Sequence, residues 1–207
     1  MNKLISVVGA SGVGKTTFVN ALAKTGNFAT AFEQHDERPF QSLFKQDTKY
    51  ALANQMDYLL LRAEQEKQLR AADKTGLMDG GLDLDFHGFT RLFRHRGLLT
   101  NSEFDLCLRL YSLLRDLLPP PDLIVVLTAP QQTIEGRLAA RRRINIASAK
   151  DAELMDGFIR EWLESISGKK SCALTHPAKR KIIPAQRVNC LSGFDRASRN
   201  LSDEASK

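Results

Sequence analysis

Residues 9–16 read Gly-Ala-Ser-Gly-Val-Gly-Lys-Thr and match the phosphate-binding pattern G-x-x-x-x-G-K-[ST]. Glycines let the backbone curl until its N–H groups point at phosphate oxygens, and a helix that starts at the loop adds the positive end of its dipole. In this pattern Lys15 reaches the β- and γ-phosphates, and the Thr16 hydroxyl coordinates Mg²⁺. An ordinary glycine turn is the alternative, but the apolar run Leu4–Val8 before the loop favours a nucleotide site. The residues predicted to hold Mg-nucleotide are Gly9, Ser11, Gly12, Val13, Gly14, Lys15, Thr16 and Thr17.

This loop does not identify the group that receives the phosphate, so the acceptor must be inferred from the other strand ends. In an open α/β sheet, ligands bind at the carboxyl ends of the strands. Three acidic residues, Glu33, Asp79 and Asp85, follow predicted strands. Phosphoryl transfer to a hydroxyl needs a base that orients the hydroxyl and carboxylates that hold Mg²⁺, which these acids can supply.

The same transfer needs cations that meet the charge on the moving phosphoryl group, and one predicted helix carries a set of arginines. Arg137 and Arg141 are four residues apart and share a helix face, and Arg143 follows them. The alternative interpretation is a basic helix end that faces solvent. Only the phosphate-binding loop upstream favours a role on the phosphates.

Strands alternate with helices along the chain, which predicts a parallel three-layer α/β sheet of the P-loop NTPase type. We expect strands at 4–8, 28–32, 77–79, 122–128 and 188–191. We expect helices at 15–24, 47–70, 85–96, 102–118, 129–143, 150–166 and 195–205, with a loop or single turn at 39–45. Ser102 is the expected N-cap of its helix, and three prolines at 119–121 end that helix.

The net charge of +6 in this chain of 207 residues arises from its C-terminal part. Nine Lys or Arg and three Asp or Glu follow Ser167, so that difference is the whole excess. We therefore expect a balanced domain at 1–167 and a basic segment at 168–207, in which 168–186 is a mobile insertion before the last strand. Phe194 is the only aromatic residue of this segment, so a nucleic-acid partner is not expected.

The cysteine count and the lack of long apolar runs exclude several classes of protein. The chain has three cysteines, an odd number at no ligand-like spacing, so neither a disulfide framework nor a cysteine-based zinc site is expected. No apolar run reaches the ~18–20 residues that a membrane span needs. Leu4–Val8 is too short for a signal peptide. These observations predict a cytoplasmic protein without a membrane partner.

An ordered set of short motifs over roughly residues 1–165 resembles the deoxynucleoside kinases. The set comprises Gly9–Thr16, Glu33-x-x-x-Glu37-x-Pro39-Phe40, Tyr50-Ala-Leu-Ala-Asn-Gln55, Arg62, Asp79-x-x-x-x-x-Asp85-x-x-x-Phe89, Pro121-Asp122-Leu-Ile-Val-Val-Leu and Arg137-x-x-x-Arg141-x-Arg143. The resemblance implies a five-stranded parallel sheet with a helical lid, and a homodimer formed through helices. It also implies transfer of the γ-phosphoryl group of ATP to the 5′-hydroxyl of a deoxynucleoside, with Mg²⁺ as cofactor.

On the acceptor side, the resemblance implies that Glu33 is the general base on the 5′-hydroxyl and that Gln55 hydrogen-bonds the edge of the nucleobase. Phe89 would stack on the base, and Arg62 and Asp85 would form a pair at its far side that tunes which base fits. The alternatives are a solvated helix face for Gln55 and Arg62, plain core for Phe89 and a loop acid for Glu33.

On the donor side, the resemblance implies that Asp79 lies near Mg²⁺. Lys15 would contact the phosphates, and Arg137, Arg141 and Arg143 would form the lid that closes on them. Lys15, Arg137 and Arg141 are therefore predicted catalytic residues together with the general base.

The chain departs from the family pattern where the acceptor is read. Gly80-Gly81 replaces the Arg-Ser that follows the strand-three acid, Phe44 replaces a tyrosine that reads the sugar 3′-hydroxyl, Ile146 replaces a lid glutamate, and Gln34 replaces a common proline. These departures leave three interpretations: the substrate is not an ordinary deoxynucleoside, Arg96 or a lid residue substitutes for the lost contacts, or the activity has decayed. Two alternative functions remain open: a thymidylate-kinase-like nucleotide kinase, and a P-loop nucleotide-binding switch or ATPase without kinase activity.

Overall fold

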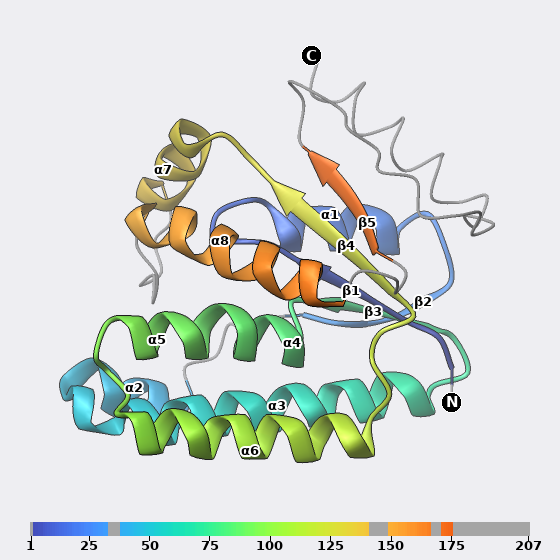
Figure 1. Cartoon of the computed structure of the whole chain (residues 1–207). Coiled ribbons are helices and arrows are strands. Elements are labelled where there is room, and N and C mark those ends of the chain that lie inside the picture. The colour runs from blue at the N-terminus through green and yellow to red at the C-terminus, as the bar shows by residue number, and fades with distance from the viewer. Residues whose placement is uncertain (1, 33–37, 141–148, 167–170, 176–207) are drawn as a thin grey trace.

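The computed structural model describes residues 2–32, 38–140, 149–166 and 171–175, and shows five parallel strands in one sheet (Figure 1). The spatial order is β2-β3-β1-β4-β5, so the central strand is the one that leads into the phosphate loop. The strands are β1 (Leu4–Val8), β2 (Phe28–Ala31), β3 (Thr75–Asp79), β4 (Leu123–Thr128) and β5 (Ser171–Thr175). This arrangement confirms the predicted α/β class and its parallel sheet.

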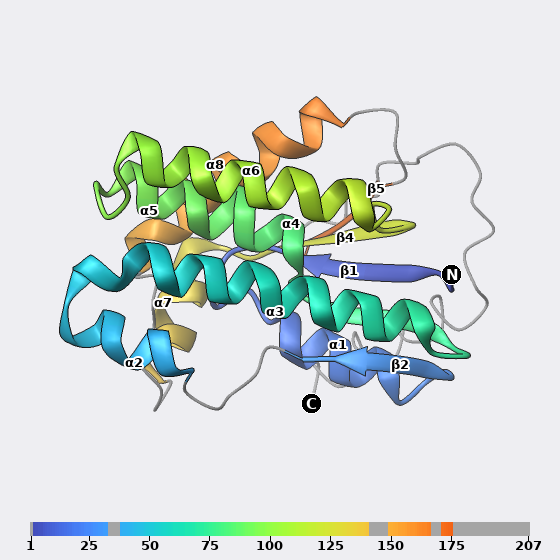
Figure 2. The ribbon, with the colours of Figure 1, turned by 90° about the horizontal axis from the view of Figure 1, so that it is seen from below.

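Helices cover both faces of the sheet (Figure 1). They are α1 (Lys15–Ala23), α2 (Pro39–Gln46), α3 (Ala51–Ala71), α4 (Leu82–Leu84), α5 (Arg91–His95), α6 (Asn101–Leu117), α7 (Gln131–Ala139) and α8 (Ala149–Ser165). A short 3₁₀ turn, η1 (Thr48–Tyr50), precedes α3, and a π-helical turn, η2 (Asp85–Thr90), joins α4 to α5. Figure 2 shows α3 and α6 side by side as the outer layer of one face.

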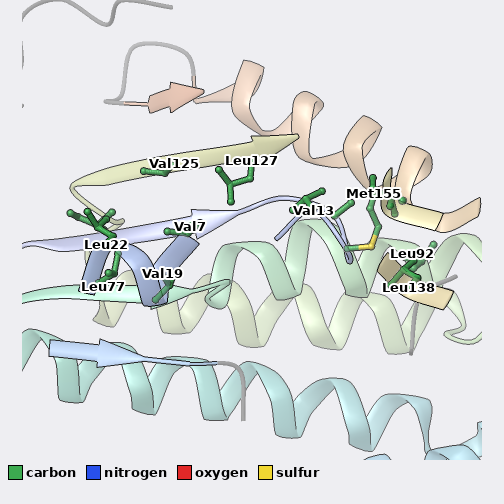
Figure 3. Close-up of a cluster of buried hydrophobic side chains, with 14 residues drawn as sticks. Val7, Val13, Val19, Leu22, Leu77, Leu92, Val125, Leu127, Leu138 and Met155 are labelled. Atoms are coloured by element: carbon green, nitrogen blue, oxygen red, sulfur yellow. The ribbon is translucent and has the colours of Figure 1, made fainter. Parts of the chain in front are cut away.

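All five residues of β1 are buried. Its alternate residues face opposite sides of the sheet, so this burial requires that both sides be covered. Val7 joins a cluster with Leu22 of α1 on one face (Figure 3). Val8 joins a second cluster with Trp162 of α8 on the other. Both faces are therefore covered, and the carboxyl end of β1 is held firmly where the phosphate loop begins.

Two local predictions are wrong. Residues 39–46 form the helix α2, with Pro39 at its first position, where proline loses no hydrogen bond. The N-cap of α6 is Thr100, because its hydroxyl accepts the Glu103 N–H and the Glu103 carboxylate accepts the Thr100 N–H in a capping box. Ser102 lies inside that helix.

The fifth strand is also not the predicted one. It is formed by residues 171–175, within the range predicted as a mobile insertion, and pairs with β4 in parallel register. Residues 176–207, including the strand expected at 188–191 and the helix expected at 195–205, lie outside the described residues. Within the described parts of the chain, no helix is long and apolar enough to cross a membrane.

Candidate active site

The phosphate loop lies between β1 and α1 and is held against β4. A side chain at residue 9 would not fit there, because a Cβ on Gly9 would lie 2.3 Å from the backbone oxygen of Leu127. The backbone φ of Gly9 is +146°, which side-chain-bearing residues rarely adopt. The loop can follow its tight path only because this position is glycine.

Lys15 and Thr16, the first residues of α1, are directed to two different sets of oxygens. The Lys15 Nζ donates to the backbone oxygens of Gly9 and Ala10 at 2.9 and 3.1 Å, so the ammonium lies across the loop. The Thr16 hydroxyl donates to the Asp79 Oδ2 at 2.5 Å. Asp79 is at this level because Val7 of β1 pairs with it in register.

These oxygens fit a bound Mg²⁺. Asp79 is fully buried, and its Oδ1 has no hydrogen-bond partner among the described residues. A buried carboxylate oxygen left unpaired is costly unless a ligand satisfies it. Hydroxyl and carboxylate oxygens are the ligands that Mg²⁺ prefers, and its remaining positions are normally filled by water and phosphate. Among the described residues no group of three or more His, Cys, Asp or Glu could hold a metal, so the fit rests on Thr16 and Asp79.

Asp156 of α8 is a residue near the phosphate loop that the motif analysis missed. Its carboxylate accepts a hydrogen bond from the backbone N–H of Ala10. Burial raises the pKa of Asp156, while that N–H, Arg160 and Lys15 act in the opposite direction. No local motif marks the residue, because it is brought to the loop by the packing of α8.

Arg137 of α7 contacts the phosphate loop directly. Its Nη1 donates to the backbone oxygens of Gly12 and Val13 at 3.3 and 2.8 Å. The structure therefore brings one of the three predicted lid arginines to the loop. Arg141, Arg143 and Ile146 lie outside the described residues, as do Glu33 and Gln34.

On the acceptor side, Arg62 of α3 and Asp85 of η2 form a buried ion pair. The Arg62 Nε donates to the Asp85 Oδ2 at 2.8 Å, and the two side chains are 4% and 6% exposed. The Arg62 Nη1 also donates to Gln65 Oε1 at 3.0 Å, and Gln65 Nε2 donates to the backbone oxygen of Phe32 at 3.3 Å. A chain of hydrogen bonds thus runs from Asp85 to Phe32, whose carbonyl forms the peptide bond with Glu33.

Gln55 and Phe89 have different environments. Gln55 is buried, and its Nε2 donates to the Thr90 hydroxyl at 2.8 Å, so the amide is not on a solvated helix face. Phe89 is half-buried and packs against the clusters that contain Leu92 and Trp162. Contact of either side chain with a base stays a prediction.

The residues that depart from the family pattern, and the candidate substitute Arg96, have the following surroundings. Gly80 has a φ of +82°, and a Cβ there would lie 3.5 Å from the Arg62 Nη2. Phe44 stacks on Phe93 with ring centroids 5.1 Å apart, within a hydrophobic cluster. Arg96, the candidate substitute cation, forms an ion pair with Asp151 near the start of α8.

Two curated proteins are similar in sequence to this chain. A deoxyadenosine kinase from Dictyostelium discoideum is 30% identical over 141 residues, which are 67% of this chain and 57% of that protein. A deoxyadenosine/deoxycytidine kinase from Bacillus subtilis (strain 168) is 26% identical over 145 residues, 69% of this chain and 67% of that protein. The chain thus spans little more than half of the first relative and two thirds of the second.

Solved structures share the fold of the described residues. Deoxyadenosine kinase from M. mycoides with bound dCTP superposes with a TM-score of 0.72 at 15% identity, covering 97% of this chain and 99% of that one. The same enzyme with bound dATP gives a TM-score of 0.71 at 16% identity, covering 99% and 100%. A family model described as deoxynucleoside kinase matches residues 5–188. Since that match covers most of the sequence, the chain belongs to the deoxynucleoside kinase family.

Proposed function

We propose that this protein is a Mg-ATP-dependent kinase that transfers the γ-phosphoryl group to the 5′-hydroxyl of a deoxynucleoside in the cytoplasm. One observation carries the proposal: two polar constellations lie close together beyond the carboxyl end of β3, where a Cβ on Gly80 would lie 3.5 Å from the Arg62 Nη2. Asp79, the last residue of the strand, accepts a hydrogen bond from Thr16. Asp85, six residues further along the chain, forms the buried ion pair with Arg62. The first constellation suits a metal-bound phosphate, and the second suits a polar base edge.

The donor side would work through the phosphate loop. Lys15, now on two loop carbonyls, would turn to the β- and γ-phosphates when ATP binds. Thr16 and Asp79 would hold Mg²⁺, which supplies charge neutralisation on the phosphate oxygens. Arg137, already on the loop, would meet the charge that develops on the transferring group, together with Arg141 and Arg143.

The acceptor side would position the nucleoside between α3 and η2. Glu33 would accept the proton of the 5′-hydroxyl as that oxygen attacks phosphorus. Gln55, Arg62 and Asp85 would read the base edge, and Phe89 would cover its face. The names of the curated relatives, a deoxyadenosine kinase and a deoxyadenosine/deoxycytidine kinase, support adenine and cytosine as the first bases to test.

A homodimer is part of the proposal, supported by exposed leucines on α3 and α6. Leu106, Leu113 and Leu117 of α6 and Leu60 of α3 are 38–67% exposed. Leu106, Leu113 and Leu117 are seven and four residues apart and so share one face of α6, and an exposed apolar face of this kind often marks a protein–protein contact. Analytical ultracentrifugation of the wild type and of Leu113→Glu tests it, since a charge in a helix–helix interface should shift the mass to that of the monomer.

The test of function is a screen of deoxynucleosides and nucleoside monophosphates with Mg-ATP. We expect phosphorylation of a deoxynucleoside by the wild type, and loss of about 10²-fold or more in Lys15→Ala with the fold intact. Lys24→Ala, at the other end of α1, is the matched control. Phosphorylation of monophosphates alone would favour the nucleotide-kinase alternative. ATP hydrolysis without any acceptor would favour the switch or ATPase, for which Gly80-Gly81 is the supporting observation.

A further inference from the structure

We propose that Thr90 is a specificity-determining positioning residue, which orients the Gln55 amide so that the site selects bases carrying an amino group over bases carrying a carbonyl at that position. This inference rests on the proposed kinase function and adds to it a residue outside the motif set. Thr90 is the last residue of the π-helical turn η2 and is fully buried.

Two hydrogen bonds meet at the Thr90 hydroxyl. It donates to the backbone oxygen of Asp85 at 3.0 Å, and it accepts from the Gln55 Nε2 at 2.8 Å. A hydroxyl has one proton and can donate only once. If its proton goes to the Asp85 carbonyl, the Gln55 group that faces it must be a donor, which is the NH₂ end of the amide.

The opposite amide orientation would lose one of these bonds. With Oε1 toward Thr90, the hydroxyl would have to donate to that oxygen, and the Asp85 carbonyl would lose its hydroxyl partner. The number of satisfied hydrogen bonds therefore distinguishes the two orientations of the amide. Gln55 is only 2% exposed, so water is not a ready replacement for the lost partner, and the orientation with Nε2 toward Thr90 is favoured.

The fixed amide has a chemical consequence for the ligand. With one N–H committed to Thr90, Gln55 presents Oε1 as acceptor beside its second N–H as donor. Adenine and cytosine present the matching order, an amino donor next to a ring-nitrogen acceptor. Hypoxanthine and uracil present a carbonyl acceptor next to an N–H donor, which would require the flipped amide. These bases should therefore be selected against by the equivalent of one buried hydrogen bond, about tenfold or more.

The π-helical turn explains why Thr90 can contact both Gln55 and the backbone of Asp85. Its hydroxyl reaches the carbonyl of the residue five positions earlier, and that residue is the Asp85 that pairs with Arg62. Thr90 thus connects the two groups proposed to read the base. Single π-helical turns are frequent at functional sites for this kind of local rearrangement.

The test compares substrates that differ only in the amino and carbonyl groups. We would measure kcat/KM for deoxyadenosine against deoxyinosine, and for deoxycytidine against deoxyuridine, in the wild type, Thr90→Val and Thr90→Ser. Valine has the shape of threonine but no hydroxyl, whereas serine keeps it. We expect the wild type to prefer the amino member of its better pair by about tenfold or more. Thr90→Val should lower that ratio by about tenfold, and Thr90→Ser should retain it.

A merely structural threonine would affect stability and overall rate without changing the ratio, so the ratio is the decisive readout. An unchanged ratio in Thr90→Val, or a wild type that prefers the carbonyl bases, would overturn this inference and leave the kinase function standing. If Thr90→Val does not fold, Thr90→Ala replaces it under the same criteria. If the wild type phosphorylates no nucleoside, the proposed function itself fails and the inference falls with it.

Discussion

The Thr16 hydroxyl on α1 and the Asp79 carboxylate on β3, separated by 63 residues, share a hydrogen bond of 2.5 Å. The other oxygen of Asp79 is buried without a partner among the described residues. We expect Asp79→Asn to lower kcat by about 10²-fold and to raise the Mg²⁺ concentration that half-saturates the enzyme, because an amide is a poorer ligand for Mg²⁺ than a carboxylate. Kinetics at varied Mg²⁺ test this, with the exposed Asp73→Asn as control. An unchanged Mg²⁺ dependence would remove Asp79 from the metal site.

The buried pair Arg62–Asp85 should show strong coupling. Removing one partner leaves the other charge buried and unpaired, so Arg62→Met and Asp85→Asn should each lower the free energy of unfolding by about 3 kcal/mol or more. The double variant should lose less than the sum of the two single changes, by at least about 1 kcal/mol. Urea unfolding of all four proteins measures the cycle. Additive losses would show that the pair contributes no specific interaction.

The lowered pKa of His87 predicts that the free energy of unfolding depends on pH. Burial, with Arg91 and Arg115 nearby, lowers its pKa from 6.5 to about 4. Its ring stacks on Trp162, and its Nε2 lies 3.1 Å from the Tyr111 hydroxyl. The folded protein therefore holds this histidine neutral where the unfolded chain would bind a proton.

Because the unfolded state takes up the proton first, the free energy of unfolding should fall as pH decreases from 6.5 to 4, by up to about 3 kcal/mol from this group. His87→Phe keeps an aromatic ring for the stack and removes the titration. Urea unfolding between pH 4 and 7 should give a shallower slope for this variant than for the wild type. Equal slopes would mean that other groups account for the acid sensitivity.

Asp156 places a negative charge beside the phosphate loop, and burial raises its pKa. A carboxyl whose pKa is raised in the folded state stabilises the fold at low pH and loses that contribution as pH rises through its folded pKa. Asp156→Asn should therefore be more stable than the wild type at pH 7, with the difference shrinking in acid. Its KM for ATP should fall about two- to fivefold, the size of one screened charge interaction. Glu153→Gln, an exposed acid on the same helix, should change neither property.

Glu33 is the predicted general base. Glu33→Gln should lower kcat by about 10²–10⁴-fold with ATP binding unchanged, because the amide keeps the shape but cannot accept a proton. Steady-state kinetics and ATP titration measure the two effects separately. A loss of less than about tenfold would identify Glu33 as a loop acid, and Glu37→Gln would be the next variant to compare.

Much of the frame could be predicted from the sequence because it depends on local patterns. The apolar β-branched run before Gly9 predicts a buried strand, and the glycine-rich loop that follows predicts phosphate binding. Short edge elements were harder to predict. Residues 171–175 are less apolar than the central strands, and they become a strand through register with β4, which the local composition does not reveal. The start of α6 was misplaced by two residues, because Thr100 and Ser102 are both good caps and only the reciprocal bond with Glu103 separates them.

By itself, the sequence determined the α/β class, the phosphate loop with Lys15 and Thr16, and the candidates on the acceptor side. Only the tertiary structure decided which of the described candidate residues are in contact and which hydrogen bonds join them. It brought Arg137 onto the loop, joined Gln55 to Thr90 across 35 residues, and linked Arg62 to the backbone of Phe32 through Gln65. The physical reason is that such hydrogen bonds join side chains from separate elements. No local pattern predicts them, because each depends on how the helices pack against the sheet.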